Sequence, residues 1–261
     1  MRGKNLKVRL LIGAAIAIFF VLKKCSQQEV NQYTGRTQTI SMSPDKEIAI
    51  GLQSAPQMAQ QHGGLHSNNQ YQALVDKVGT KLVNSSIAKD TPYRYEFHLL
   101  ADPNTINAFA LPGGQIFITH ALFSKLENED QLAGVLGHEI GHVLGRHSAE
   151  RIAESEYWQG LTTAGSVGAD MGGVISGIGQ NTLLTNGRDD ELESDDLGVR
   201  FMIKAGYNPK EMIGVMEILK AAAGPNRVPE FKSTHPDPDN RIEKIQESIE
   251  KYQNQSQKNA S

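Results

Sequence analysis

The sequence predicts an α+β domain that is predominantly helical and carries a small antiparallel sheet. Apolar side chains recur at helical spacing over residues 69–83 and 129–149. Residues 93–99 alternate apolar and polar side chains, as a half-buried strand does. Residues 107–119 (NAFALPGGQIFIT) read as strand, Pro-Gly-Gly turn and strand. Because this hairpin directly precedes the helix at 129–149, we expect the sheet to lie beside that helix.

The first 24 residues (1–24) predict a membrane-attachment segment. Basic residues precede an apolar run at 10–22, as in an export signal. The thirteen residues of this run are fewer than the about twenty of a spanning helix, although terminal lysines can reach the interface. Lys23 and Lys24 fit neither a small-residue cleavage site nor a lipoprotein signal at Cys25. We therefore expect an uncleaved anchor that holds the rest of the chain outside the cytoplasm, rather than lipidation or a cleaved signal.

The rest of the chain predicts a linker, one main domain and a tail. Residues 25–42 are rich in Gln, Thr and Ser, which predicts a polar linker. Ser43 and Pro44 then supply an N-cap and a first helical position, so the main domain begins there and extends over 43–253. The polar residues 254–261 are expected to form a disordered tail.

Two further segments predict helix packing. Residues 160–179 are dense in Gly and other small residues. We interpret them as a site of close helix packing rather than as a lid or a membrane-touching segment. Residues 209–222 place four apolar side chains on one helical face, which predicts a core helix.

Composition restricts the classes of function. The 261 residues, 39% of them hydrophobic, suffice for one substantial core. The net charge of −3 argues against a phosphate-binding surface, so nucleic acid is not an expected partner. Cys25 is the only cysteine, which excludes an intrachain disulfide and a thiolate metal site.

The pattern His-Glu-Ile-Gly-His at residues 138–142 carries the strongest functional signal. It lies on the predicted helix at 129–149, where positions i and i+4 share a face. His138 and His142 can therefore direct two imidazole nitrogens to one Zn²⁺. Glu139 stands beside them as a base for the attacking water.

A tetrahedral zinc site with an open position needs a third protein ligand from further along the chain. One known pattern adds a glycine at the eighth position and a histidine at the eleventh. Gly145 fits the eighth position, but Ser148 occupies the eleventh. His147 is one residue early and points away on the same predicted helix, so this pattern fails on register.

A second helix, predicted at 188–204, offers a carboxylate instead. Glu191 and Asp195 are four residues apart and share a face, whereas Glu193 points elsewhere. We therefore predict Glu191 as the third ligand and Asp195 as the residue that orients a ligand imidazole through its free N–H. The alternative is a solvated acidic start of a helix.

These two motifs resemble a known family. GHEIGHVLGRH (137–147) followed by GRDDELESDDLG (187–198) looks like the gluzincin metallopeptidases that include the CAAX prenyl endopeptidases and the bacterial proteases HtpX and BepA. The resemblance implies a zincin-like fold, one Zn²⁺ per chain and a ligand role for Glu191. Gly187 and Ser194 depart from the family's usual Ser and Ala, and both are small-for-small changes.

The resemblance extends to the hairpin at 107–119. It implies that the first strand is an exposed sheet edge along which an extended substrate pairs by backbone hydrogen bonds. The candidate substrate contacts are Asn107, Ala108, Phe109 and Ala110. Without the resemblance, this segment is simply a β-hairpin.

The segment STHPDPDNRI (233–242) resembles a motif near the end of the family's catalytic domain. The resemblance implies that His235 is a reversible fourth zinc ligand or a transition-state contact, and that Arg241 pairs with an acidic residue of the site. Alternatively, the segment only starts the final helix.

Together these features predict a membrane-tethered zinc endopeptidase in the bacterial cell envelope, with its catalytic domain in the periplasm or otherwise outside the cytoplasm. Unfolded or misassembled polypeptides are the substrates that the resemblance implies. Two alternatives are a non-catalytic, zinc-stabilised chaperone or adaptor and a zinc hydrolase of another bond. Glu139 argues against the first, because structural zinc has no use for a base beside an open position.

Overall fold

The computed structural model describes residues 2–222, 235 and 240–258. Most of the segment 233–242 and the end of the predicted tail, 259–261, lie outside the described residues. The chain divides into two compact units, and it contributes two segments to each of them. The core unit comprises Ser43–Arg146 and Arg188–Ser261, and the helical unit comprises Met1–Met42 and His147–Gly187.

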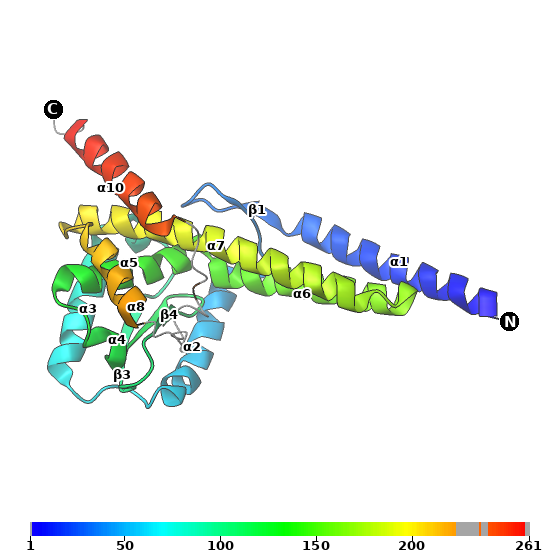
Figure 1. Cartoon of the computed structure of the whole chain (residues 1–261), viewed down its shortest axis with the longest axis horizontal. Helices are drawn as coiled ribbons and strands as arrows, with labels where there is room; N and C mark the ends of the chain where they lie inside the picture. The colour runs from blue at the N-terminus through cyan, green and yellow to red at the C-terminus, as the bar shows by residue number, and fades with distance from the viewer. Residues whose placement is uncertain (1, 223–234, 236–239, 259–261) are drawn as a thin grey trace. The chain divides into compact units, whose positions relative to one another are not determined.

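A three-stranded sheet forms the centre of the core unit (Figure 1). Its strands are β3 (Glu96–Leu100), β4 (Ala108–Ala110) and β5 (Gln115–Thr119). β4 and β5 form the predicted antiparallel hairpin, but β3 pairs with β5 in parallel. The expected antiparallel sheet is therefore wrong in part, because β5 inserts between β3 and β4. Alternation along a strand shows which face is buried and carries no information about the neighbouring strand.

Helices surround this sheet, with the C-terminal part of α7 (Gly172–Ala205) among them. The others are α2 (Pro44–Gln61), α3 (Asn69–Asn84), the 3-10 helix η1 (Ile87–Asp90), α4 (His120–Phe123), α5 (Glu129–Gly145), α8 (Glu211–Ala222) and α10 (Arg241–Lys258). α3 and α5 pack against the sheet and against each other, and α8 packs on α5. α10 continues into the segment predicted as a tail, as far as Lys258.

α5 is the most deeply buried helix of the core unit. Its apolar residues, spaced by four, are almost inaccessible to solvent: Leu132, Leu136, Ile140 and Leu144. Asn128 caps its first turn by accepting a hydrogen bond from the backbone N–H of Gln131. The helix is fixed by burial on nearly every side, so its polar side chains are held in one orientation.

The helix predicted over 129–149 is interrupted at Arg146. This residue has a left-handed backbone (φ 58°), which ends α5, and a new helix starts at His147. Arg146 Nε and Nη2 lie 2.9 and 2.6 Å from Glu47 Oε1 on α2, and Tyr93 Oη lies 3.4 Å from Glu47 Oε2. The apolar periodicity continues across the break, which is why the pattern alone did not reveal it.

The helical unit consists of α1 (Arg2–Ser26), α6 (His147–Ala169), the N-terminal part of α7 and a short hairpin. α1 packs closely along α6. A Cβ at Gly13 would lie 2.8 Å from Gly168 Cα, and one at Gly160 would lie 2.3 Å from the ring of Phe20. Gly160 and Gly168 therefore pack closely against α1, which confirms the close helix packing expected in 160–179 but does not test membrane contact. No described helix is both long and apolar enough to cross a membrane.

Residues 25–42, expected to be a polar linker, contain a β-hairpin in the helical unit. Its strands are β1 (Gln28–Val30) and β2 (Thr37–Thr39), paired antiparallel. The buried Asn31 donates from Nδ2 to Gln38 Oε1 at 3.0 Å, and Gln38 Nε2 donates to Glu150 at 3.0 Å. Polar side chains that satisfy one another in this way can be ordered despite a composition typical of linkers.

Candidate metal centre

α5 brings the two histidines of the His-Glu-Ile-Gly-His pattern together. His138 and His142 lie one helical turn apart, and their Nε2 atoms are 3.0 Å from each other. His138 is only 3% exposed. The predicted pair of imidazole nitrogens on one helix face is therefore present in the fold.

Small residues bring α7 against the same part of α5. A Cβ at Gly141 would lie 2.9 Å from Ser194 Cα, and one at Gly137 would lie 3.4 Å from Gly198 Cα. The four residues form a close seam between the helices. Within each helix the two small residues have i, i+4 spacing, a signal from which the sequence could have predicted this seam. The seam brings the turn of α7 that precedes Ser194 within reach of the histidines.

That turn of α7 supplies Glu191, whose carboxylate completes the cluster. Glu191 Oε2 lies 3.3 Å from His138 Nε2, and Oε1 lies 3.3 Å from His142 Nε2. The side chain is fully buried, and although burial opposes its charge, the nearby His235 and His142 lower the pKa of Glu191 well below its usual value. Glu193 is half-buried and does not belong to this cluster.

His235 is the fourth member. Its Nδ1 lies 3.0 Å from Glu191 Oε1 and 3.3 Å from His138 Nε2, and its Nε2 lies 3.2 Å from the carbonyl oxygen of Ala108. Among the described residues, the structure thus groups four side chains with donor atoms within 4.8 Å of one another: His138, His142, Glu191 and His235.

Asp195 and Arg241 support His138 from behind. Asp195 Oδ1 lies 2.8 Å from His138 Nδ1, so the imidazole can donate to the carboxylate. Arg241 donates to both oxygens of Asp195, at 2.7 and 2.9 Å, and Arg241 Nη2 lies 3.2 Å from Glu191 Oε2. Burial opposes the charge of Asp195, but Arg241 and His138 lower its pKa. The predicted pairing of Arg241 with acidic residues is present.

Glu139 differs from these carboxylates. It is fully buried, and neither carboxylate oxygen has a hydrogen-bond partner among the described residues. His235 Nε2 lies 3.6 Å from Glu139 Oε1. Burial is the largest influence and raises the pKa of Glu139. A buried carboxylate without hydrogen bonds is costly, which is typical of functional sites rather than of structural ones.

The predicted substrate contacts lie at the edge of the sheet. β4 pairs with β5 on one side, and its other side carries no strand among the described residues. Ala108 and Ala110 belong to β4, and Phe109 stacks on Phe117 with ring centroids 5.0 Å apart. Asn107 precedes the strand and is 1% exposed, with its backbone bonded to Thr119.

The four-residue cluster fits a tetrahedral metal ion. With zinc–ligand bonds of 2.0–2.2 Å, neighbouring donor atoms stand about 3.3 Å apart. Five of the six pairwise separations among the four side chains are 3.0–3.3 Å and match this spacing. Two facing imidazole nitrogens and a buried carboxylate are also the donor types that zinc takes.

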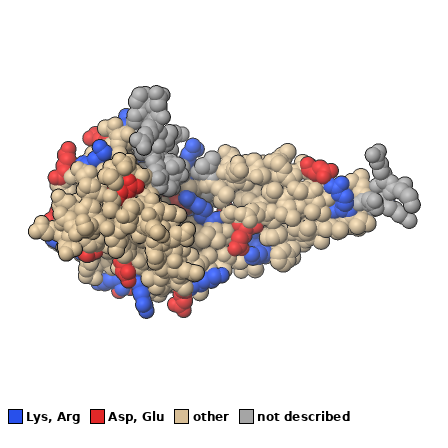
Figure 2. All heavy atoms as spheres, turned by 90° about the horizontal axis from the view of Figure 1, so that it is seen from below, with Lys and Arg blue, Asp and Glu red and all other residues tan. Residues whose placement is uncertain are grey.

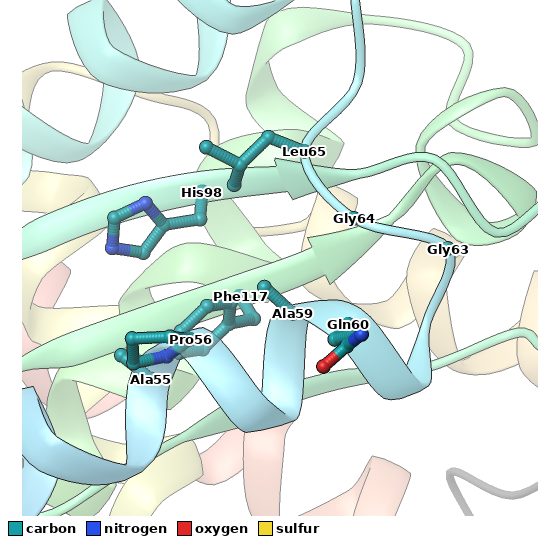
Figure 3. A pocket seen from close by; sticks show the side chains of 9 residues that line it. All are labelled: Ala55, Pro56, Ala59, Gln60, Gly63, Gly64, Leu65, His98 and Phe117. Atoms are coloured by element: carbon teal, nitrogen blue, oxygen red, sulfur yellow. The ribbon is translucent and has the colours of Figure 1, made fainter.

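A separate cavity of about 670 Å³ lies between α2 and the sheet (Figure 3). His98 and Phe117 line it from the sheet, on the face opposite Phe97 because side chains alternate along a strand. The remaining lining residues come from α2 and the loop that follows it: Ala55, Pro56, Ala59, Gln60, Gly63, Gly64 and Leu65. None of the metal-cluster residues lines this cavity.

Comparison with known proteins agrees with this geometry. The model of peptidase family M48 matches residues 69–249. The chain belongs to peptidase family M48. This confirms the predicted metallopeptidase resemblance, and the mostly helical α+β fold is consistent with the zincin-like domain of M48 peptidases. The M48 match includes the segments that carry the four-residue cluster and Glu139.

Individual M48 relatives are similar over part of their length. The mitochondrial metalloendopeptidase OMA1 of Schizosaccharomyces pombe is 36% identical over 163 residues, which cover 61% of this chain and 48% of that protein. The beta-barrel assembly-enhancing protease of Escherichia coli K12 is 31% identical over 182 residues, 64% of this chain and 37% of the relative. The Yersinia pestis protein of the same name is 29% identical over 224 residues, which cover 80% of this chain and 45% of that protein. The chain therefore matches less than half of each of these relatives.

Proposed function

We propose that this M48 protein is a zinc-dependent endopeptidase that cleaves peptide bonds in polypeptides. One observation carries the proposal. A buried carboxylate without hydrogen-bond partners, Glu139, adjoins a donor cluster with the spacing of a tetrahedral zinc site. Membership in the M48 family supports the same chemistry.

In this proposal, His138, His142 and Glu191 hold one Zn²⁺ per chain. Zinc, when bound, would polarise the carbonyl of the scissile peptide bond as a Lewis acid. Asp195 fixes the orientation of the His138 ring by accepting from Nδ1, and Arg241 holds Asp195 in place. Substitution of Asp195 or Arg241 would therefore leave His138 in place but free its ring to change orientation.

Glu139 acts as the general base and then as the general acid. Its carboxylate takes a proton from the attacking water while the water oxygen bonds to the carbonyl carbon. The protonated Glu139 then gives this proton to the departing amine nitrogen as the C–N bond breaks. Its raised pKa suits both steps, because a more basic carboxylate takes a proton more readily and can then return it. No covalent acyl-enzyme is required.

The free side of β4 is the proposed substrate track. An extended chain can add to this edge by backbone hydrogen bonds along Ala108, Phe109 and Ala110. The backbone of Asn107, just before the strand, already bonds to Thr119, so Asn107 is left out of the proposed track. His235 Nε2 meets the carbonyl of Ala108 at this edge. We propose that His235 is either a reversible fourth zinc ligand or a transition-state contact.

We further propose that residues 1–24 attach the peptidase to a membrane and hold the core unit outside the cytoplasm, in the periplasm of a bacterial cell. The proposed substrates are unfolded or misassembled polypeptides. The support comes from the basic start and apolar run of the N-terminal segment and from the name of the E. coli relative, which links that protein to β-barrel assembly.

Glu139→Gln tests the proposed reaction. The variant keeps the shape of the side chain and removes its basicity, so we expect it to retain zinc and to lose about 10²–10⁴-fold of its activity on an unfolded protein. Zinc content and cleavage are measured on the same full-length preparations. Equal cleavage by both proteins would refute Glu139 as the base, and absence of cleavage by a zinc-loaded wild type would favour a non-catalytic chaperone or adaptor.

A further inference from the structure

The helical unit contains a band of three helical segments without charged side chains. Residues 10–22 of α1, 157–169 of α6 and 172–187 of α7 contain no Asp, Glu, Lys or Arg. At 1.5 Å per residue, the thirteen-residue runs of α1 and α6 are each roughly 20 Å long. Figure 2 shows tan surface over most of the visible face of these helices, with the charges gathered towards the two ends.

Ion pairs mark both ends of this band. At one end, Arg9 of α1 pairs with Asp170 at 2.7 Å. At the other, Lys23 pairs with Glu156 at 2.8 Å and Lys24 pairs with Glu154 at 2.9 Å. The charged residues that flank the apolar run of α1 thus pair with charged residues at both ends of the uncharged run of α6. Between these ion pairs, neither helix carries a charged side chain.

Large apolar side chains are exposed on the α1 and α7 parts of the band, beside uncharged polar ones such as Thr163 of α6 and Gln180 of α7. On α1 the apolar side chains are Leu10, Leu11, Ile12, Ile18, Phe19, Val21 and Leu22, each 43–70% exposed. At 100° per residue they span about 200° of the helix, roughly twice the stripe with which a helix packs on one partner. Val174 and Ile178 of α7 are 60% and 54% exposed. A surface this broad fits an apolar solvent better than a single partner helix.

Aromatic and basic residues lie where an interface with water would be. Tyr157 and Trp158 begin the band on α6, and Lys24 Nζ lies 4.6 Å from the centre of the Tyr157 ring. Aromatic rings and lysines are enriched where hydrocarbon meets headgroups. Beyond the opposite end, α1 carries several basic residues, which complement anionic headgroups: Arg2, Lys4, Lys7 and Arg9.

We propose that α1, α6 and the first part of α7 bind a lipid bilayer together, so that the insert between the two metal-binding motifs is itself a membrane-contacting surface. The inference rests on the proposed membrane attachment and extends it from α1 to the insert. Lipid covers the uncharged band, and the ion-paired ends lie at the headgroup level. A second copy of this chain is the competing occupant.

Two α7 substitutions test the proposal without altering α1. Full-length Val174→Glu/Ile178→Glu protein is compared with wild type by flotation with vesicles of phosphatidylethanolamine and phosphatidylglycerol. We expect at least about tenfold weaker vesicle binding, because acidic side chains in hydrocarbon are strongly disfavoured. Leu52→Glu/Leu65→Glu is the matched control, since it places the same charges at exposed apolar positions of the core unit and should float as wild type does.

Trp158 provides a second measurement that needs no substitution. It is the only tryptophan of the chain, so brominated acyl chains in the vesicles should quench the intrinsic tryptophan emission of the wild-type protein. Wild-type flotation by the α7 variant together with absent quenching would overturn the proposal. So would a wild-type dimer that the α7 substitutions dissociate while vesicle binding is unchanged, because the band would then cover a second copy.

Zinc content and cleavage of an unfolded protein, measured on the same samples, separate this inference from the proposed function. Vesicle binding that persists in a wild type without cleavage would reject the peptidase and retain the lipid surface. Leu11→Glu/Phe19→Glu abolishing flotation while the α7 variant floats normally would retain the anchor and reject the contribution of the insert.

Discussion

The core unit buries charged side chains, whereas the helical unit exposes large apolar side chains. In the core unit, Glu191 and Asp195 are at most 2% exposed. In the helical unit, Leu11, Phe19 and Leu22 are 61–70% exposed. Each arrangement is unfavourable for a protein surrounded only by water, because ions lose hydration when buried and apolar groups lose their partners when exposed. The difference supports the proposals that the core unit surrounds a metal ion and that the helical unit contacts an apolar phase.

Removal of the third ligand should have the largest effect on the core unit. Glu191→Ala is expected to weaken zinc binding by about a thousandfold or more, since the large binding free energy of zinc is shared among few ligands. Competition with a chromophoric chelator measures the affinity. Glu193→Ala is the control and should change it little. A larger loss for Glu193→Ala would move the third ligand to that residue.

The buried pair that follows α5 should have the next largest effect. Glu47→Gln leaves the guanidinium of Arg146 without its countercharge, and breaking a buried pair typically costs about 3–5 kcal/mol. Chemical denaturation of the full chain measures the free energy of unfolding. Glu129→Gln, which breaks the exposed pair with Lys77, should cost under about 1 kcal/mol. Equal costs would mean that burial does not distinguish the two pairs.

Asp195→Asn should weaken zinc binding by about 10–100-fold, because the substitution removes the charge that orients His138 but leaves every ligand in place. Asp189→Asn on the exposed face of the same helix is the matched control. Wild-type affinity of Asp195→Asn would show that the seam between α5 and α7 alone positions the imidazole.

The stabilisation of the fold by zinc should depend on pH. Although burial opposes its charge, hydrogen bonds to Asp195 and Glu191 raise the pKa of His138 to about 10 in the absence of metal. Protonated His138 therefore stabilises the metal-free fold fully below its unfolded pKa of about 6.5, and this contribution is lost as pH rises towards 10. Zinc needs the neutral imidazole. The increase in Tm on adding zinc should therefore grow over this range, and a constant increase would contradict the proposed linkage.

The smallest effect is expected in the helical unit. Lys23→Ala removes an exposed ion pair with Glu156 and should change the free energy of unfolding by less than about 1 kcal/mol in detergent solution. Lys7→Ala, which lies outside the band, is the control. A loss comparable to that of Glu47→Gln would mean that the ends of the band are held by charge and not by the packing of α1 on α6.

Much of the metal centre could be predicted because it depends on local periodicity. Spacing of i, i+4 was sufficient to choose His138, His142 and Glu191. His235 entered only through the family resemblance, since no periodicity connects it to the other three. The sheet order was not predicted, because it depends on pairing between strands that are not neighbours in the sequence. The hairpin in 25–42 was not predicted either, because it depends on hydrogen bonds between polar side chains. The end of α5 at Arg146 is also invisible in the pattern, since a left-handed arginine carries no composition signal.

The absence of a side chain at Gly141 has a consequence for how the protein can vary. A single methyl group there would meet the backbone of Ser194 at 2.9 Å and force the two helices apart. The carboxylate of Glu191, one turn before Ser194, would then move away from the imidazoles of His138 and His142, although all of these residues would still be present in the sequence. The size of the residue at position 141 thus sets the distance between the two helices that carry the proposed metal ligands. A library of variants screened for activity should find this position nearly as intolerant of substitution as the ligands themselves.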